Sequence, residues 1–123
     1  MAQGMLEHVN VTVSDPRRTA EMLERLFGWR IRWEGPAKLN GRTVHVGTDH
    51  AYVALWSPTP GFSAGKEDSG LNHIGVLVED LDAAETLVKA EGLEPYNHGD
   101  YEPGRRFYFD DSDGVEFEVV SYA

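Results

Sequence analysis

The sequence contains no cysteine, comparatively few basic residues and no long apolar run. Without cysteine there is neither a disulfide framework nor a thiol nucleophile, which fits the reducing cytoplasm where we expect this protein. Spanning a bilayer takes about 20 consecutive apolar residues, and neither such a run nor a signal peptide is apparent. The 11 basic residues face 21 acidic ones, for a formal net charge of −10. We therefore expect no membrane and no nucleic-acid partner, because phosphate binding needs a basic face.

What the chain does contain is an internal repeat, in which two similar strands each carry a histidine near the start. The first copy reads Glu7-His8-Val9-Asn10-Val11-Thr12-Val13 and the second reads Asn72-His73-Ile74-Gly75-Val76-Leu77-Val78. The two histidines lie 65 positions apart, and Ala20-Glu21-Met22-Leu23 has its counterpart in Ala84-Glu85-Thr86-Leu87. A duplicated unit brings equivalent side chains together across a pseudo-two-fold axis, so the repeat indicates both the fold and a site.

Each copy is predicted to form a strand, a helix and three further strands. In the first, a period-2 strand over 6–13 precedes a helix that begins at Asp15-Pro16 and ends at Gly28. Strands are expected over 29–33, 42–46 and 51–56, with a hairpin turn at Asn40-Gly41. The second copy has a strand over 71–78, a helix over 81–91 and strands near 93–96, 105–109 and 115–121.

These patterns predict an α+β domain over 1–123. It consists of two βαβββ modules, 5–57 and 71–122, joined by a linker over 58–70. The helices cover one face of a curved mixed sheet and leave the other face concave.

Alternation along the strands selects the residues that face this concavity. His8 and Asn10 turn inward on the first strand, and His73 turns inward on its counterpart. Glu118 turns inward on the last strand, whereas Ala54 occupies the position equivalent to Glu118 in the first copy. Two imidazoles and one carboxylate are typical of a site for Fe²⁺, Mn²⁺ or Zn²⁺ that leaves coordination positions open.

Other polar residues near this site have a second, simpler interpretation. Tyr108 is predicted to face inward, and His45 either lines the hollow and assists proton transfer or lies at the surface. Glu116 is interpreted as a solvated residue of an edge strand. Arg105 and Arg106 flank the second hollow, where they hold an anionic group or are simply solvated. The segment from Asp110 to Gly114 lacks the spacing of a calcium loop and is predicted to be a turn.

The chain resembles the vicinal oxygen chelate superfamily, which includes glyoxalases, bleomycin-resistance proteins and extradiol dioxygenases. The resemblance rests on Leu6-Glu7-His8-Val9, on Leu71-Asn72-His73-Ile74 and on the closing segment from Phe107 to Glu118. It implies the glyoxalase-like fold, a homodimer and metal ligands at His8, His73 and Glu118. In a dimer the site lies within one chain or is shared between two chains, and the sequence does not decide between them.

This chain differs from individual members of the superfamily at several positions, so the resemblance does not identify the reaction. Glyoxalase I uses a fourth protein ligand where this chain has Ala54, and fosfomycin-modifying enzymes have threonine where this chain has Asn10. Extradiol dioxygenases use an additional acid–base histidine, for which His45 is the candidate. A lyase, isomerase, dioxygenase or transferase all fit the superfamily.

The sequence therefore supports two main functions. The first is a divalent-metal-dependent enzyme that chelates two adjacent oxygens of a small metabolite, with Tyr108, Asn10 and His45 as the candidate catalytic residues. The second is a metal-free protein that sequesters a small molecule in an aromatic-lined hollow, as bleomycin-resistance proteins do. An inactive interaction protein is a third possibility. The histidines and the glutamate favour the enzyme, because a binding protein does not need them.

Overall fold

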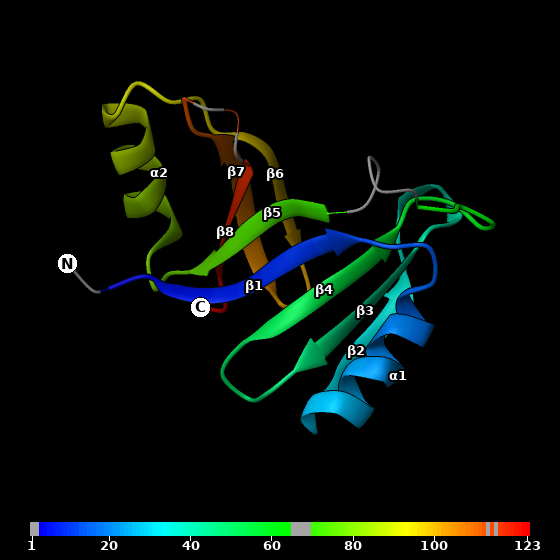
Figure 1. Cartoon of the computed structure of the whole chain (residues 1–123). Helices are drawn as coiled ribbons and strands as arrows, with labels where there is room; N and C mark the ends of the chain where they lie inside the picture. Colours follow the sequence, from blue (N-terminus) through cyan, green and yellow to red (C-terminus); the bar gives the residue numbers. More distant parts are fainter. Residues whose placement is uncertain (1–2, 65–69, 113, 115) are drawn as a thin grey trace. The chain divides into compact units, whose positions relative to one another are not determined.

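The computed structural model describes residues 3–64, 70–112, 114 and 116–123, and it forms two compact units. One unit comprises His8–Asn72, and the other comprises the strand residues up to Glu7 together with His73–Ala123. The order of elements is strand, helix and three strands, twice over (Figure 1). No helix in the described part of the chain is long and apolar enough to cross a bilayer.

The His8–Asn72 unit contains the greater part of β1 (Met5–Thr12), then α1 (Pro16–Phe27), β2 (Arg30–Pro36), β3 (Arg42–Gly47) and β4 (Tyr52–Ser57). A short 3₁₀ turn, Lys38–Asn40, joins β2 to β3. The strands are ordered β2-β3-β4-β1, with β1 parallel to β4 and the other pairs antiparallel. The helix begins and ends as predicted, because Asp15 caps its first turn and Gly28 adopts a left-handed conformation after its last.

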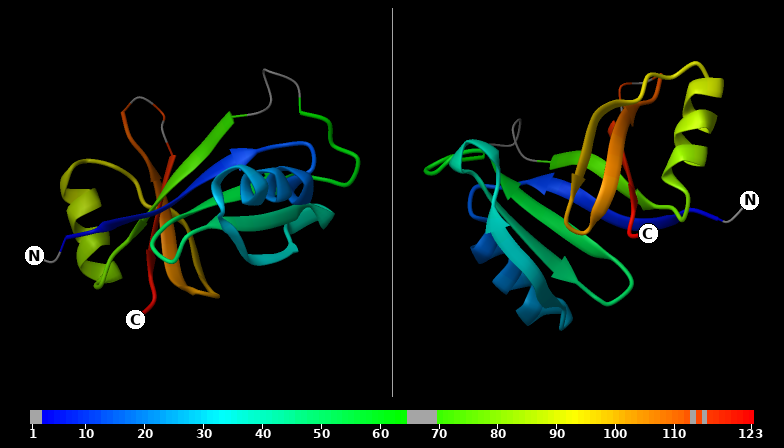
Figure 2. Two further views of the ribbon diagram at one scale, coloured as in Figure 1. Left: turned by 60° about the horizontal axis from the view of Figure 1, so that its bottom comes forward. Right: turned by 180° about the vertical axis from the view of Figure 1, so that it is seen from behind.

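The core of this unit lies between α1 and its sheet, and Figure 2 shows the helix running along β2, β3 and β4. The side chains that form it come from the helix and from alternate strand positions: Ala20, Val44, Val46 and Leu55, with Val11, Val13, Leu23, Trp29, Ile31 and Val53 packed around them. Val11 of β1 and Val13 just after it thus pack in this core as predicted, which leaves His8 and Asn10 on the opposite face of the sheet.

The second unit repeats this arrangement with the greater part of β5 (Gly70–Leu77), then α2 (Leu81–Ala90), β6 (Tyr96–Tyr101), β7 (Gly104–Asp110) and β8 (Glu116–Ser121). Its strands are ordered β5-β8-β7-β6, and β5 is parallel to β8. The core packs α2 against β7 and β8 through Leu81, Phe107 and Val119, with Val78, Ala84, Val88 and Phe109 around them.

Two local predictions differ from the structure. β6 begins at Tyr96 rather than near 93, because Pro95 has no N–H to donate to a neighbouring strand. The turn between β2 and β3 lies where Asn40-Gly41 indicates, but Leu39 and Asn40 adopt the positive φ angles while Gly41 is extended. Gly41 is instead required for space, because a Cβ there would lie 2.3 Å from the carbonyl oxygen of Ser57. Residues 65–69 of the predicted linker lie outside the described residues.

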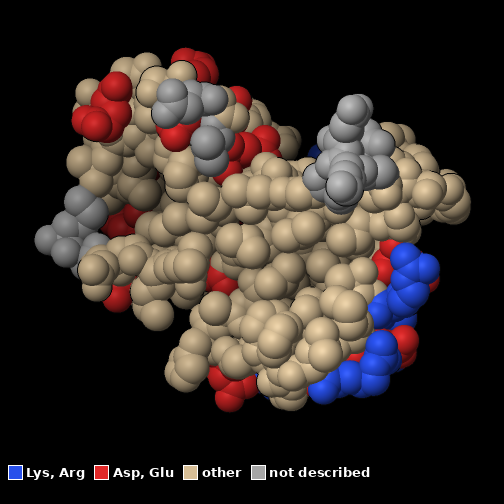
Figure 3. Space-filling model, viewed as in Figure 1, with Lys and Arg blue, Asp and Glu red and all other residues tan. Residues whose placement is uncertain are grey.

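Charge is unevenly distributed over the face seen in Figure 3. On this face the basic side chains gather over the His8–Asn72 unit, where acidic side chains lie among them. In that unit Arg17 and Arg42 both pair with Glu34, and the hydrogen bond from Arg42 is the main cause that lowers the pKa of Glu34. Glu21 is a second partner of Arg17, so two carboxylates balance the two arginines and these exposed side chains do not form a basic patch for a polyanion.

Candidate metal centre

The centre of the second unit is a buried histidine–glutamate pair. Gly75 of β5 is the register partner of Glu118 in β8, and His73 lies two residues earlier on the same face of β5. The Nε2 atom of His73 is 2.9 Å from Oε1 of Glu118, and the two side chains are only 8% and 4% exposed. A neutral imidazole and a carboxylate that converge in this way are the donors that Fe²⁺, Mn²⁺ and Zn²⁺ accept.

Arg106 lies against the other oxygen of the same glutamate. Its Nη1 donates to Oε2 of Glu118 at 2.6 Å, and both side chains are buried. The interpretation of Arg106 as a solvated charge is therefore wrong, whereas Arg105 is exposed and pairs with Asp82. Adjacent strand residues point to opposite faces, so alternation along β7 could have separated the two arginines.

Glu116 also belongs to this centre, although the sequence suggested a solvated edge residue. Its Oε1 lies 3.5 Å from Nδ1 of His73, so the ring has a carboxylate near each nitrogen. The hydroxyl of Tyr96 lies 2.7 Å from Oε2 of Glu116 and 2.7 Å from Oδ1 of Asp110. Burial is the main cause that raises the pKa of Tyr96 above its ordinary value, and these two carboxylates raise it further. A carboxylate beside the second nitrogen fixes the orientation and tautomer of a metal-binding histidine.

Tyr108 faces inward as predicted and packs edge-on against His73. The ring centroids lie 5.7 Å apart at an angle of 89° between the ring planes. Desolvation, followed by the nearby charge of Glu118, raises the pKa of the Tyr108 phenol well above its ordinary value. The phenol therefore stays protonated at neutral pH, so it can donate a hydrogen bond but cannot act as a base.

The inward-facing residues of the first unit form an aromatic row. His8 pairs in register with Tyr52 and stacks on it, with centroids 4.9 Å apart and ring planes 13° apart. Tyr52 stacks in turn on His45 at 4.4 Å, and His45 packs on Trp33 at 5.0 Å. The guanidinium of Arg32 lies 4.6 Å from the centre of the Tyr52 ring, in cation–π geometry. His45 is thus part of the inward face rather than an isolated surface histidine.

Asn10 and Ala54 are register partners on the same face of this unit. Ala54 is 2% exposed and carries no ligand atom, so β4 supplies an apolar surface at the position equivalent to Glu118. The Oδ1 atom of Asn10 is buried and accepts no hydrogen bond from the described residues. Such an atom is costly unless a partner satisfies it, and a bound ligand is one such partner.

Three predicted ligands therefore have the properties that a metal requires. His8, His73 and Glu118 are all buried, and each offers one ligand atom of a suitable type. His73 and Glu118 belong to one unit together with Arg106, Glu116 and Tyr108. His8 belongs to the other unit, together with Asn10, His45 and Tyr52.

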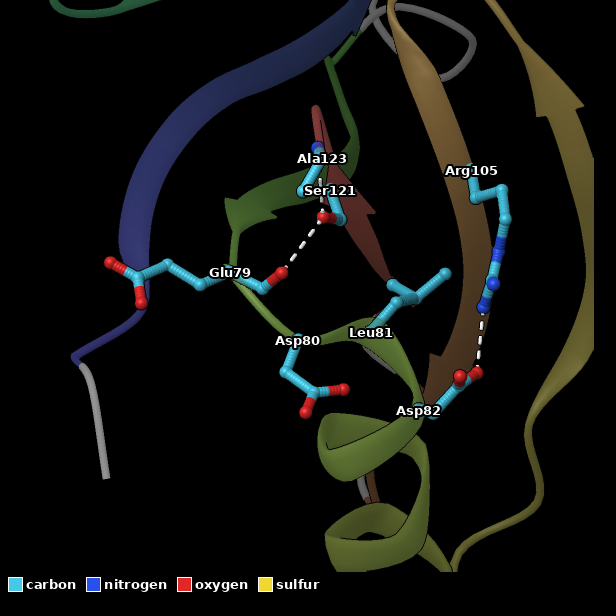
Figure 4. A pocket seen from close by; sticks show the side chains of 7 residues that line it. All are labelled: Glu79, Asp80, Leu81, Asp82, Arg105, Ser121 and Ala123. Atoms are coloured by element: carbon cyan, nitrogen blue, oxygen red, sulfur yellow. Dashed lines mark hydrogen bonds and ion pairs between the residues drawn. The ribbon is translucent and has the colours of Figure 1, made fainter.

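A separate pocket of about 280 Å³ lies in the second unit, at the first turn of α2. Figure 4 shows Arg105 turned toward Asp82 on one side, and Ser121 turned toward the carbonyl of Glu79 on the other. Asp80 caps the helix by accepting a hydrogen bond from the backbone of Ala83. The side chains of Asp80, Asp82 and Ser121 in this pocket thus make local hydrogen bonds, and His8, His73 and Glu118 do not line it.

Comparisons with known proteins agree with this organisation. The sequence model of the glyoxalase/bleomycin resistance protein/dioxygenase superfamily matches residues 5–119 of this chain. The structure is similar to the methylmalonyl-CoA epimerase of Mycobacterium tuberculosis, with a TM-score of 0.81 and 21% identity over 97% of this chain and 88% of that one. No curated protein sequence gives a significant match.

Two other solved structures are equally informative about the fold. A variant of the Streptomyces coelicolor methylmalonyl-CoA epimerase, in complex with 2-nitronate-propionyl-CoA, has a TM-score of 0.78 and 22% identity over 97% of each chain. A hypothetical protein of Bacillus halodurans has a TM-score of 0.80 and 14% identity over 98% of this chain and 95% of that one. The predicted glyoxalase-like fold of two βαβββ modules is thereby confirmed.

Proposed function

Because the chain belongs to the glyoxalase/bleomycin resistance protein/dioxygenase superfamily, we propose that it is a divalent-metal-dependent enzyme acting on a small oxygenated metabolite. His8, His73 and Glu118 are the proposed ligands. The single observation that carries the proposal is the buried pair of His73 and Glu118, whose ligand atoms converge to 2.9 Å. His8 completes the set because it occupies the repeat position equivalent to His73 and is itself buried.

The surroundings of the pair support a metal rather than an ordinary buried ion pair. A metal-ligating histidine commonly has its second nitrogen near a carboxylate, and Glu116 lies 3.5 Å from Nδ1 of His73. Arg106 also lies beside the pair, and it contacts Oε2 of Glu118 whereas His73 contacts Oε1. When bound, a divalent ion supplies Lewis-acid stabilisation of negative charge on a substrate oxygen.

The other inward-facing residues have roles that follow from their surroundings. Tyr108 keeps its proton and is proposed to donate a hydrogen bond to substrate. Asn10 is proposed to satisfy its unpaired Oδ1 with a donor group of the substrate. His45, stacked between Trp33 and Tyr52, is the proposed proton-transfer residue of the first unit.

Among the reactions open to the superfamily, we favour proton transfer at the carbon next to a thioester carbonyl. Two similar solved structures contain ligands of this kind, methylmalonyl-CoA in one and 2-nitronate-propionyl-CoA in the other. A malonyl-type thioester presents two oxygens to one cation, which matches bidentate chelation by a site with three protein ligands. A cytoplasmic homodimer is the proposed form of the enzyme.

One observation favours a second function, which is binding without chemistry. The row of Trp33, His45, Tyr52 and His8 offers a series of ring faces, and Trp33 is 49% exposed. Such a surface could hold a planar or apolar molecule with no metal. His8 then acts as an aromatic wall rather than as a ligand.

An assay of the metal-stripped protein separates the two functions. We would add Mn²⁺, Fe²⁺, Zn²⁺ or Co²⁺ and follow solvent-deuterium incorporation into methylmalonyl-CoA, with diols, oxo-thioesters and epoxides as further substrates. Metal-dependent turnover of any of these supports the enzyme, and incorporation next to the thioester supports the favoured reaction. If none of these ions supports turnover and calorimetry detects no ion binding at micromolar concentration, the metal-dependent proposal is wrong and the binding function is favoured.

A further inference from the structure

Arg106 has several partners around Glu118, although its buried Nε has none among the described residues. Its Nη1 donates to Oε2 of the glutamate at 2.6 Å. Its Nη2 lies within hydrogen-bond distance of three backbone carbonyl oxygens in the β6–β7 turn, those of Tyr101 at 2.9 Å, Glu102 at 3.1 Å and Gly104 at 3.0 Å. The guanidinium carbon also lies 4.1 Å from the centre of the Tyr101 ring. The turn thus holds the guanidinium in one position.

Two glycines make this arrangement possible. A Cβ at Gly104 would lie 1.8 Å from the carbonyl oxygen of Ser121, so only glycine lets the turn approach the end of β8. A Cβ at Gly99 would lie 2.8 Å from the ring of Tyr101, the same ring that covers the guanidinium of Arg106. Gly104 therefore allows the β6–β7 turn to approach β8, and Gly99 leaves room for the Tyr101 ring beside the guanidinium.

The two carboxylate oxygens of Glu118 therefore have different partners. Oε2 accepts from the anchored guanidinium, whereas Oε1 faces Nε2 of His73. A carboxylate held in this way cannot turn to present both oxygens to a cation on the histidine side. It can offer one oxygen at a defined position, while the adjacent positive charge offsets part of its negative charge.

We propose that Arg106 is a positioning residue of the metal centre, which uses its fork of donors to hold Glu118 as a one-oxygen ligand. This rests on the proposed function, because it requires that Glu118 bind a divalent ion. The fork is essential to it, since a lysine has one compact ammonium that cannot reach Oε2 and the three turn carbonyls at once.

A purely structural role for the same ion pair is the competing explanation. An arginine that only tied the β6–β7 turn to β8 would affect stability and leave the metal environment unchanged. The two explanations differ in the visible absorption spectrum of the Co²⁺-loaded protein, because those bands report how the ligands surround the ion. A structural role does not move these bands in protein that remains folded.

The test compares Arg106→Lys and Arg106→Gln with the neighbouring control Arg105→Gln, whose arginine is exposed and pairs with Asp82. Mn²⁺ affinity is measured by calorimetry, Co²⁺ spectra are recorded at saturation, and circular dichroism verifies folding. We expect both Arg106 variants to bind Mn²⁺ about 10- to 100-fold more weakly and to shift the Co²⁺ bands. Arg105→Gln should retain the wild-type affinity and spectrum.

Three results would overturn the positioning role of Arg106. Wild-type affinity and an unshifted spectrum in folded Arg106→Lys would overturn the positioning role, and this variant keeps the charge in case Arg106→Gln does not fold. Equal effects of the Arg105 and Arg106 variants would also overturn it. If the unmodified protein binds neither ion, the proposed metal-dependent function itself fails, and the role of Arg106 fails with it.

Discussion

Replacing Glu118 with glutamine should destabilise the metal-free protein, although it removes a negative charge from a buried site. An unpaired buried carboxylate is costly, so replacing such a group with a neutral one would stabilise a protein. Here the carboxylate already has two partners, Nε2 of His73 at 2.9 Å and Nη1 of Arg106 at 2.6 Å. Glu118→Gln leaves the Arg106 guanidinium buried without its counter-charge.

The magnitude follows from what remains after the substitution. Breaking a buried ion pair by removing one partner costs about 3–5 kcal/mol. The glutamine oxygen can still accept from Arg106, and the turn carbonyls still accept from Nη2. We therefore expect the lower end, about 3 kcal/mol, which is a large part of the roughly 5–15 kcal/mol that stabilises a typical domain.

Urea unfolding of metal-stripped protein, followed by circular dichroism, measures this cost. With a denaturant slope of about 2 kcal/mol per molar, the midpoint of Glu118→Gln should fall by about 1.5 M. Glu85→Gln is a suitable control, because Glu85 pairs with the half-exposed His98 and should lose less than about 1 kcal/mol. An unchanged or higher midpoint for Glu118→Gln would refute the reasoning, since the Arg106 pair would then add nothing to the metal-free fold.

Three further predictions concern the second unit. Gly104→Ala should lower the free energy of unfolding by about 1–3 kcal/mol or more, seen as a lower urea midpoint, because its Cβ would lie 1.8 Å from the carbonyl oxygen of Ser121. Asp80→Ala should cost about 1 kcal/mol in the same assay through loss of the α2 cap. The hydrogen bond with His98 is the main cause that lowers the pKa of Glu85. This bond therefore stabilises the folded protein above the ordinary glutamate pKa, and the stabilisation is lost as pH falls through the lowered pKa of Glu85. His98→Gln should accordingly flatten the acid side of the stability–pH curve, and an unchanged curve would contradict this assignment.

The sequence was sufficient to predict the helices and strands, and to predict which residues of most strands face inward. Repetition of the His8 and His73 strands identified two equivalent modules, and alternation placed valines toward the helices. Asp15, Pro16 and Gly28 defined α1 to the residue, because capping is a local interaction. The far end of β6, after residue 96, was not predicted, because Asn97, His98, Gly99 and Asp100 form a polar strand with a positive φ at Asn97, a pattern that resembles a loop.

The surroundings of the predicted ligands were less accessible to sequence reasoning. Glu116 and Arg106 resemble surface charges in a sequence, because burial of a charge depends on partners that only the pairing of β5, β7 and β8 supplies. Tyr96 could not be recognised as a partner of Glu116, since the two are brought together by strand pairing rather than by spacing. The sequence was sufficient to name the predicted ligands, but the residues that contact those ligands could be identified only from the structure.

The most direct test of the metal centre is the binding of Mn²⁺ to the metal-stripped protein by calorimetry, in the unmodified chain and in His8→Gln, His73→Gln and His98→Gln. One ion per chain should bind to the unmodified protein and to the control His98→Gln, whose histidine is half-exposed and pairs with Glu85. The variants at His8 and His73 should each bind at least 100-fold more weakly while remaining folded. Wild-type affinity in either of these two variants, or absence of binding to the unmodified chain, would contradict a centre built from both halves of the repeat.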